Sequence, residues 1–388
     1  MNKFKLFFPI VLVLTSIVIF SCEKDSTVGF DDQQEQADDV QSDNTRHVGG
    51  LIFMDEAEYQ TLPVVDLQSL ENISGDNDVE SRSQYIKIYT PPVVSQGAEG
   101  SCTAFATSYT VSSYYTSVFR SMPYTNSQAI RSPEYVYNSS KIAGDCGRGA
   151  YLSDVLNFIR DKGVCSWSQM PYTDANGCNV KPNATQISQG VIGKIKSWNT
   201  VAKNVTSIKE LLKKGYPVIM AFDANTNFDK ETLKAPYIYK SYKQDTKYYG
   251  HAVTIVGYDD VKKHFIVQNS WGTWNHDKGF FYVTYNLFPT IARELYVMHP
   301  FFPENIKVRH ASKVNEITIK MNNISYLIKK GQTVSIPAKF TPNQLEIWEC
   351  IFQGQNQNCK WDNFAPAQGK SYKIIDVNTN YDLKLVLE

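Results

Sequence analysis

Apolar residues recur first at helical spacing and later at strand spacing, and this order along the chain constrains the fold most strongly. Helical spacing comes first, because Leu152, Val155, Leu156 and Ile159 form one apolar stripe that ends at Gly163. A second helical stripe consists of Ile208, Leu211 and Leu212 and ends at Gly215. Strand patterns follow at residues 217–222, 252–258, 264–268 and 279–284. Helices that precede antiparallel strands predict an α+β domain rather than a repeating α/β one. We expect this domain to span residues 85–303.

A different pattern follows Asn305. Short alternating strands appear without any helical period, at residues 316–321, 325–329, 333–337 and 383–387. This predicts a small all-β, sandwich-like accessory domain over residues 304–388. Trp348 and Trp361 could stack on a sugar there, although aromatic packing in a core is the commoner use. A glycan or protein ligand of this domain is therefore an alternative to a structural role.

The N-terminus has the layout of an export signal. Lys3 and Lys5 precede an apolar run over residues 6–20, which is short for a membrane span. The run ends in Ser21-Cys22 and resembles a bacterial lipobox, whose Cys becomes the lipidated first residue. We expect a lipoprotein signal peptide over residues 1–21 and lipidation of Cys22. An ordinary signal peptide with an incidental Cys is the alternative.

Two segments separate this signal from the α+β domain. Residues 22–48 are rich in Asp and Glu and predict an acidic, flexible tether. Residues 49–84 predict a linker or a short leader. The run Glu23-Lys24-Asp25 resembles the surface-export tag of lipoproteins from Bacteroidetes. We therefore expect a protein that is lipid-anchored at the bacterial outer membrane, on the periplasmic face or the cell surface.

Charge and residue spacing limit the classes of ligand and partner that we expect this chain to bind. Lys plus Arg and Asp plus Glu both number 39, so no overall field attracts nucleic acid, and we expect no nucleic-acid partner. The six His residues lack metal-ligand spacing and no phosphate-binding loop is present, so we expect no metal and no cofactor.

The seven cysteines allow several pairings in an exported chain. One bridge is expected among Cys146, Cys165 and Cys178, and we favour Cys165 with Cys178. A second is expected between Cys350 and Cys359, with two reduced buried thiols as the alternative.

One cysteine stands where a glycine-containing loop enters a helix. Cys102 follows Gly97 and Gly100, and the positive end of a helix dipole at that point favours a thiolate. The glycines allow a substrate carbonyl to approach the backbone. Gln96 could reach back over the loop and, with the Cys102 N–H, provide two donors for an oxyanion. Taken alone, such a Cys is more often a buried structural thiol.

A base for this thiol is predicted by a hairpin of residues 252–258 and 264–268. If the turn centres on Asp260, His251 faces Asn269 at the open end of the hairpin, within hydrogen-bonding reach. A neutral amide there would hold the imidazole in one tautomer. Trp271 would lie on the same face and shield that hydrogen bond from water.

Together these segments resemble the signature blocks of papain-like cysteine peptidases. The blocks are residues 96–105, the His251-Ala252-Val253 run and the Asn269-Ser270-Trp271-Gly272 run, in the order that the family uses. The resemblance implies a two-lobed fold, with a helical left lobe and an antiparallel β right lobe. It implies hydrolysis of protein or peptide substrates, with Cys102 as nucleophile, His251 as acid and base, Asn269 as its orienter and Gln96 in the oxyanion hole. It further implies that Gly149 binds the substrate backbone, and we expect Gly100 and Trp271 to contact the substrate as well.

One departure from the family pattern concerns Glu99. Many members have a Cys there, paired with the counterpart of Cys146, so that bridge is missing here. The resemblance covers roughly residues 91–282. An adhesive surface lipoprotein, in which the papain-like part is only a scaffold, is the alternative to an endopeptidase.

Overall fold

The structure is a computed structural model. It describes residues 49–73, 79–82, 84–174, 177–225, 228, 234–242, 248–302, 306–313, 315–321, 324–336, 345–353, 356–366, 370–376 and 383–388. The predicted signal peptide, Cys22 and the acidic tether lie outside the described residues.

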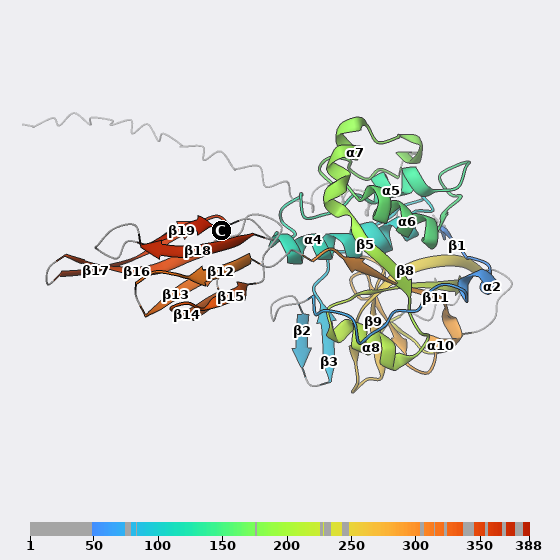
Figure 1. Ribbon diagram of the computed structural model, residues 1–388. Helices are drawn as coiled ribbons and strands as arrows, with labels where there is room; N and C mark the ends of the chain where they lie inside the picture. Colours follow the sequence, from blue (N-terminus) through green and yellow to red (C-terminus); the bar gives the residue numbers. More distant parts are fainter. Residues whose placement is uncertain are drawn as a thin grey trace, which may run out of the picture.

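The helical lobe is built around one long helix that begins at Cys102. Its three consecutive parts are α3 (Cys102–Ala104), a π-helical stretch (Phe105–Ser112) and α4 (Ser113–Arg120). Around it lie α5 (Pro133–Ser140), α6 (Leu152–Lys162) and α7 (Ala184–Gly190) (Figure 1). The predicted helix of residues 152–162 is confirmed, and Gly163 ends it with a positive φ of 79°. Among the described residues, no helix combines the length and the apolar character needed to cross a bilayer.

The second lobe is a largely antiparallel sheet. Its main strands lie in the order β5-β11-β6-β8-β9-β10-β7. Their bounds are β5 Ile195–Thr200, β6 Val218–Asn225, β7 Ile238–Tyr239, β8 Tyr248–Asp259, β9 His264–Gln268, β10 Phe280–Thr284 and β11 Ala292–Pro300. The helices α8 (Val205–Lys213) and α10 (Phe288–Ile291) accompany this sheet. The helices of the first lobe precede these main strands in the sequence, which is the predicted α+β arrangement.

The hairpin of β8 and β9 forms, but with a different register from the one predicted. Thr254 pairs with Gln268, a shift of two residues, and the ladder slips once more between Ile255 and Gly257. A shift of two residues leaves every side chain on its original face of the sheet, because the side-chain period is also two. His251 and Asn269 are therefore diagonal neighbours on one face instead of direct partners.

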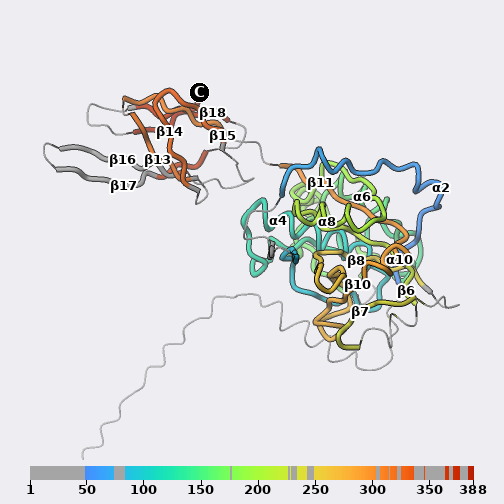
Figure 2. The backbone as a smooth tube through the Cα atoms, turned by 90° about the horizontal axis from the view of Figure 1, so that it is seen from below, coloured from blue at the N-terminus to red at the C-terminus, as the bar shows by residue number. Residues whose placement is uncertain are grey.

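The segment ahead of the α+β domain is not a free linker. It contributes β1 (Leu51–Ile52), α2 (Glu56–Tyr59), β2 (Val79–Arg82) and, after Gln84, β3 (Tyr85–Ile88). The strand β1 pairs with β8 and with the short β4 (Ala150–Tyr151), and β3 pairs with β2 and β8. Tyr59 is buried and exchanges hydrogen bonds with the backbone of Leu295. Figure 2 shows this blue segment following the surface of the domain from α2 past β11.

The chain after Pro300 forms separate β sheets, as expected. One sheet has the order β15-β12-β18-β19 and the other β14-β13-β16-β17. Their bounds are β12 Ile306–His310, β13 Glu316–Met321, β14 Ile324–Lys329, β15 Thr333–Ile336, β16 Leu345–Gln353, β17 Asn356–Phe364, β18 Ser371–Asp376 and β19 Leu383–Leu387. Residues from both sheets, such as Val308 and Ile319, share one small core, which is the arrangement of a sandwich.

Candidate active site

Cys102 is the first residue of the long helix, and it is fully buried. Burial raises the pKa of the thiol to about 11, although the backbone N–H groups of Ala252, Gly50 and Thr103 act in the opposite direction. Two of these donors belong to other segments, so the thiol lies where β8 and the N-terminal segment meet the helix. In this state the thiol is shielded from solvent and is protonated at neutral pH.

The imidazole of His251 is held by Asn269. The Nε2 atom of His251 lies 2.8 Å from Oδ1 of Asn269. An amide oxygen only accepts hydrogen bonds, so Nε2 must carry the proton and the tautomer is fixed. The same oxygen also accepts the backbone N–H of Ser270 at 2.9 Å, which orients the amide group.

An aromatic wall covers this pair. The ring of Trp271 stacks on the imidazole of His251 with 4.7 Å between ring centroids and 27° between the planes. Phe228 lies edge-on against Trp271 at 5.2 Å. His251 and Trp271 are both almost fully buried, so water has little access to the His251–Asn269 hydrogen bond. The structure thus places Trp271 against the base, as a cover rather than an open substrate surface.

The side chain of Gln96 links the loop ahead of Cys102 to the segment of Asn269. Its Nε2 donates to the carbonyl oxygen of Glu99 at 2.9 Å, and its Oε1 accepts the hydroxyl of Ser270 at 2.7 Å. The backbone N–H of Gln96 donates to the carbonyl of Ser270 at 2.8 Å. Sequence reasoning missed Ser270, because its position beside Asn269 gave no sign that it would fix Gln96.

The N-terminal residues 49–52 lie directly against these groups. Leu51 pairs antiparallel with Gly250, the neighbour of His251, and in parallel with Ala150, the neighbour of Gly149. The carbonyl of Gly50 accepts the N–H of Ala150 at 2.9 Å. A β-carbon on Gly149, whose φ is +80°, would stand 2.3 Å from that carbonyl oxygen. Gly149 therefore contacts a peptide backbone, and that backbone belongs to the chain itself.

The predicted bridge between Cys165 and Cys178 is wrong. The disulfide joins Cys146 to Cys178, with Cα atoms 5.6 Å apart, and Cys165 is a free buried thiol. Spacing in the sequence favoured the nearer pair, whereas the fold brings Cys178 beside the loop that precedes Gly149. The other expected pair, Cys350 and Cys359, lies directly opposite in the register of β16 and β17. Their side chains, like those of Trp348 and Trp361, lie outside the described part, and that bridge stays a prediction.

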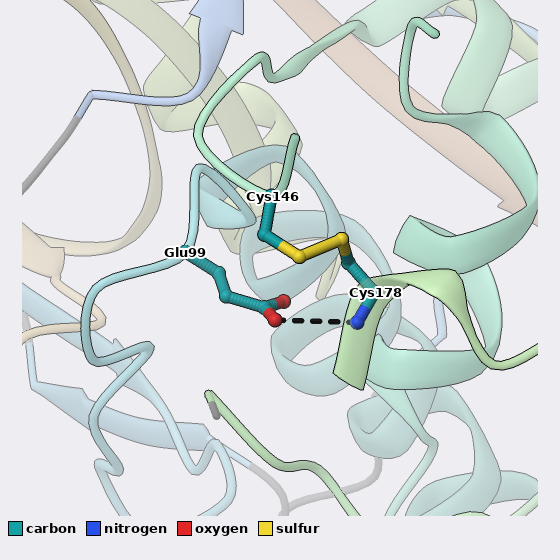
Figure 3. A group of neighbouring side chains, drawn as sticks. All are labelled: Glu99, Cys146 and Cys178. Atoms are coloured by element: carbon teal, nitrogen blue, oxygen red, sulfur yellow. Dashed lines mark hydrogen bonds between the residues drawn. A yellow bond between two sulfur atoms is a disulfide. The ribbon is translucent and has the colours of Figure 1, made fainter. Parts of the chain in front are cut away.

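Glu99 points at the disulfide (Figure 3). Its carboxyl group and the sulfurs of Cys146 and Cys178 lie within 4.8 Å of one another. Three such ligand atoms resemble a metal site in number, but a disulfide has no thiolate to offer a cation. The residues present do not fit a metal ion, and this cluster is a structural one.

An α+β fold with a buried cysteine at a helix start and an oriented histidine defines a thiol-hydrolase type of site. The sequence model for "Papain family cysteine protease" matches residues 76–298. The chain therefore belongs to the papain family of cysteine proteases.

Several relatives share this part of the chain. "Gamete and mating-type specific protein A" of Dictyostelium discoideum is 28% identical over 207 residues, covering 50% of this chain and 41% of that protein. "Cysteine proteinase 1" of Entamoeba histolytica is 31% identical over 154 residues, covering 38% and 46%. The chain thus spans about half the length of these curated relatives. The crystal structure of xylellain, a cysteine protease from Xylella fastidiosa, shares the fold, with a TM-score of 0.51 and 20% identity over 66% of this chain and 98% of that one.

Proposed function

We propose that this chain is a thiol-dependent endopeptidase that acts on proteins or peptides. The observation that carries the proposal is the 2.8 Å hydrogen bond between His251 and Asn269. Nε2 donates this hydrogen bond, so Nδ1 is the nitrogen that exchanges a proton with the thiol of Cys102. A scaffold protein would not need a buried imidazole with a fixed tautomer.

The reaction then proceeds in two halves. His251 takes the proton of Cys102, and the thiolate attacks the carbonyl carbon of the scissile peptide bond. The carbon–nitrogen bond breaks as His251 gives its proton to the leaving amine, which leaves a thioester on the sulfur. His251 next takes a proton from water, and the hydroxide attacks the thioester. The carbon–sulfur bond breaks, the acid leaves, and the thiol regains a proton.

The oxyanion formed in each half needs two donors. The backbone N–H of Cys102 is one, and Nε2 of Gln96 is the other. That nitrogen now donates to the carbonyl of Glu99, and Ser270 anchors the opposite end of the amide. Gly100 has no side chain that would keep the substrate backbone away from this loop, and its N–H holds the loop in place by donating to the carbonyl of Cys146 at 2.8 Å.

We further propose that the state described is latent. Residues 49–52 occupy the space between β4 and β8 in which a substrate backbone would bind. The thiol of Cys102 beneath them is inaccessible to solvent. This favours the short-leader interpretation of residues 49–84. The test is hydrolysis of a casein or peptide library by the full chain before and after limited proteolysis ahead of Tyr85. Activity that appears on cleavage and is absent from Cys102→Ala supports the proposal, and activity retained by Cys102→Ala contradicts it.

The setting proposed is the bacterial outer membrane, with lipid on Cys22. The support is the sequence alone: the charged start, the short apolar run and the Ser21-Cys22 junction. Expression of the full chain in a bacterium that processes lipoproteins, with radiolabelled palmitate, tests it. Label in the membrane fraction that is lost in Cys22→Ala supports the anchor, and an unlabelled secreted product contradicts it.

A further inference from the structure

We propose that Glu99 is a positioning residue of this peptidase. Its neutral carboxyl group fastens the loop that carries Gln96 and Cys102 to the Cys146–Cys178 disulfide, and its ionisation loosens that loop. The inference rests on the proposed function, since it concerns the alignment of the groups that stabilise the oxyanion.

Two hydrogen bonds fasten this loop to the two halves of the disulfide. The Oε1 atom of Glu99 accepts the backbone N–H of Cys178 at 3.2 Å. The next residue, Gly100, donates its N–H to the carbonyl of Cys146 at 2.8 Å. Glu99 as a whole residue is only 1% exposed, so both bonds are sheltered from water. Figure 3 shows the carboxyl group lying between the loop and the yellow sulfur–sulfur bond.

The same residue controls both oxyanion donors. The carbonyl oxygen of Glu99 accepts Nε2 of Gln96 at 2.9 Å, and Glu99 lies three residues before Cys102. A displacement of Glu99 therefore moves the side-chain donor and the backbone donor together. Donors of this kind act only when they are aligned before the reaction begins.

The surroundings of Glu99 suit a neutral carboxyl group. Burial, and then the carboxyl group of Glu134 on α5, raise the pKa of Glu99 to about 7, and Asp174 adds in the same direction. The hydrogen bond from the backbone N–H of Cys178 acts in the opposite direction and lowers this pKa, and so does the cation Lys141, whose Nζ is bound to the carbonyl of Gly144 at the surface. Among the described residues, Oε2 of Glu99 has no hydrogen-bond partner.

Two hydroxyl groups also face this carboxyl group, those of Tyr137 on α5 and Tyr172. The pKa of Tyr137 is raised by burial, and the pKa of Tyr172 is raised well above its ordinary value for the same reason, so both stay neutral. The hydroxyl of Tyr137 donates to Cys146 and that of Tyr172 donates to Gln96, at 2.6 and 2.7 Å. Neither is available to an ionised Glu99 without breaking those bonds.

Ionisation of Glu99 therefore creates a buried charge that is in contact with no cation among the residues that the structure describes. The loop must open toward water to solvate it, which displaces the donors of Gln96 and Cys102. A negative charge at this point also disfavours the thiolate and the oxyanion through like-charge repulsion. Both effects lower activity as the pH rises, so the alkaline limb of the rate profile should follow Glu99.

The test compares kcat/KM from pH 5 to 9 for the full chain, activated in the same way, with Glu99→Gln and Glu99→Ala. One pH unit above its pKa, only about one tenth of a carboxyl group is protonated, so the parent protein should lose about tenfold in kcat/KM by pH 8. Glu99→Gln keeps an oxygen acceptor for Cys178 and cannot ionise, so it should retain its pH 6 activity at pH 8. Glu99→Ala should have a lower kcat, by about tenfold, at every pH because the hydrogen bond to Cys178 and the packing beside it are lost.

Two control measurements distinguish Glu99 from other buried carboxyl groups. Glu294 is another buried glutamate whose pKa burial raises, and it lies on β11, so Glu294→Gln should keep the parent profile. Infrared spectra should show a protonated carboxyl band at pH 6 that Glu99→Gln lacks. The proposal is overturned if Glu99→Gln has the parent profile, or if it is as inactive as Glu99→Ala. Absence of hydrolysis by the parent protein at every pH instead identifies a failure of the proposed function, on which this role depends.

Discussion

The α-carbon of Gly50 lies so near the carbonyl group of Gly100 that a β-carbon on Gly50 would stand 1.7 Å from the oxygen. Real side chains are not accommodated at that distance. The N-terminal segment can therefore lie against the loop of the nucleophile only because residue 50 has no side chain. The closed state therefore depends on the glycine at position 50, which lets the two backbones meet.

Substitution of Gly50 should open the site. In Gly50→Ala the added methyl group meets backbone atoms that have little room to move, so the segment is displaced from the thiol. The buried thiol of Cys102 has a pKa of about 11 against an ordinary 9.0, so full exposure raises its thiolate fraction by up to about a hundredfold at neutral pH. We expect faster alkylation of Cys102 by iodoacetamide, measured by mass spectrometry of the native protein. Thr61→Ala, in an exposed turn of the same segment, should alkylate at the parent rate, and equal rates for both variants would contradict the closed state.

The orienting role of Asn269 can be separated from a purely structural one. Asn269→Ala removes the acceptor of His251 Nε2, and loss of a ~1.4 kcal/mol interaction in the transition state lowers kcat by about tenfold. The chain contains a matched control, because His299 Nε2 lies 2.9 Å from Oδ1 of Asn199 on the neighbouring strand. Asn199→Ala should change the melting temperature and leave kcat near the parent value. Equal losses of kcat in both variants would show that Asn269 matters only for folding.

Disulfide mapping and stability test the revised cysteine pairing. Cys178→Ala opens a loop that spans 32 residues, which should lower the free energy of unfolding by about 3 to 4 kcal/mol. Cys165→Ala removes a free buried thiol and should cost less. Urea titration measures both values. A peptide that links Cys146 to Cys178 should appear in a non-reducing digest, and a peptide that links Cys165 to Cys178 would refute the pairing.

Glu99 should also leave a signature in the pH dependence of stability. Its folded-state pKa of about 7 exceeds the ordinary 4.5, so between these values the folded protein binds more protons than the unfolded one. The stability of the parent protein relative to Glu99→Gln should therefore fall as the pH rises from 4.5 to 7 and change little above 7. The half-buried His299, with its pKa lowered to about 4 by desolvation, has the opposite slope but is common to both proteins. Melting temperatures of the pair at pH 4.5 and 7.5 measure the difference, and a constant difference contradicts the assignment.

Local patterns in the sequence were sufficient for much of the fold. The apolar stripe of residues 152–159 and the glycine after it predicted α6, because helix period and C-terminal capping are properties of the segment itself. The hairpin of β8 and β9 was also predicted, although its register was shifted by two residues by a bulge and a later turn. An even shift keeps the faces, so the contact between His251 and Asn269 survived the error.

Contacts between distant segments could not be predicted in the same way. The pairing of Leu51 with Gly250 and Ala150 joins residues 199 and 99 positions apart, and a strand of two residues is too short to show a hydrophobic period. The partner of Cys178 depended on where the loop of Cys146 lies in space rather than on spacing. The same applies to Ser270, whose contact with Gln96 arises only when the two lobes meet.

If Cys102 is the nucleophile of a latent peptidase, covalent labelling should find its thiol reactive once the N-terminal segment is displaced. The full chain and its Gly50→Ala variant would be treated with an epoxysuccinyl inhibitor, and the modified peptide would be mapped by mass spectrometry. We predict a single adduct on Cys102, formed faster in Gly50→Ala, absent from Cys102→Ala and weakened in His251→Ala. An unmodified Cys102 in the opened variant, or an adduct on Cys165 instead, would contradict the account.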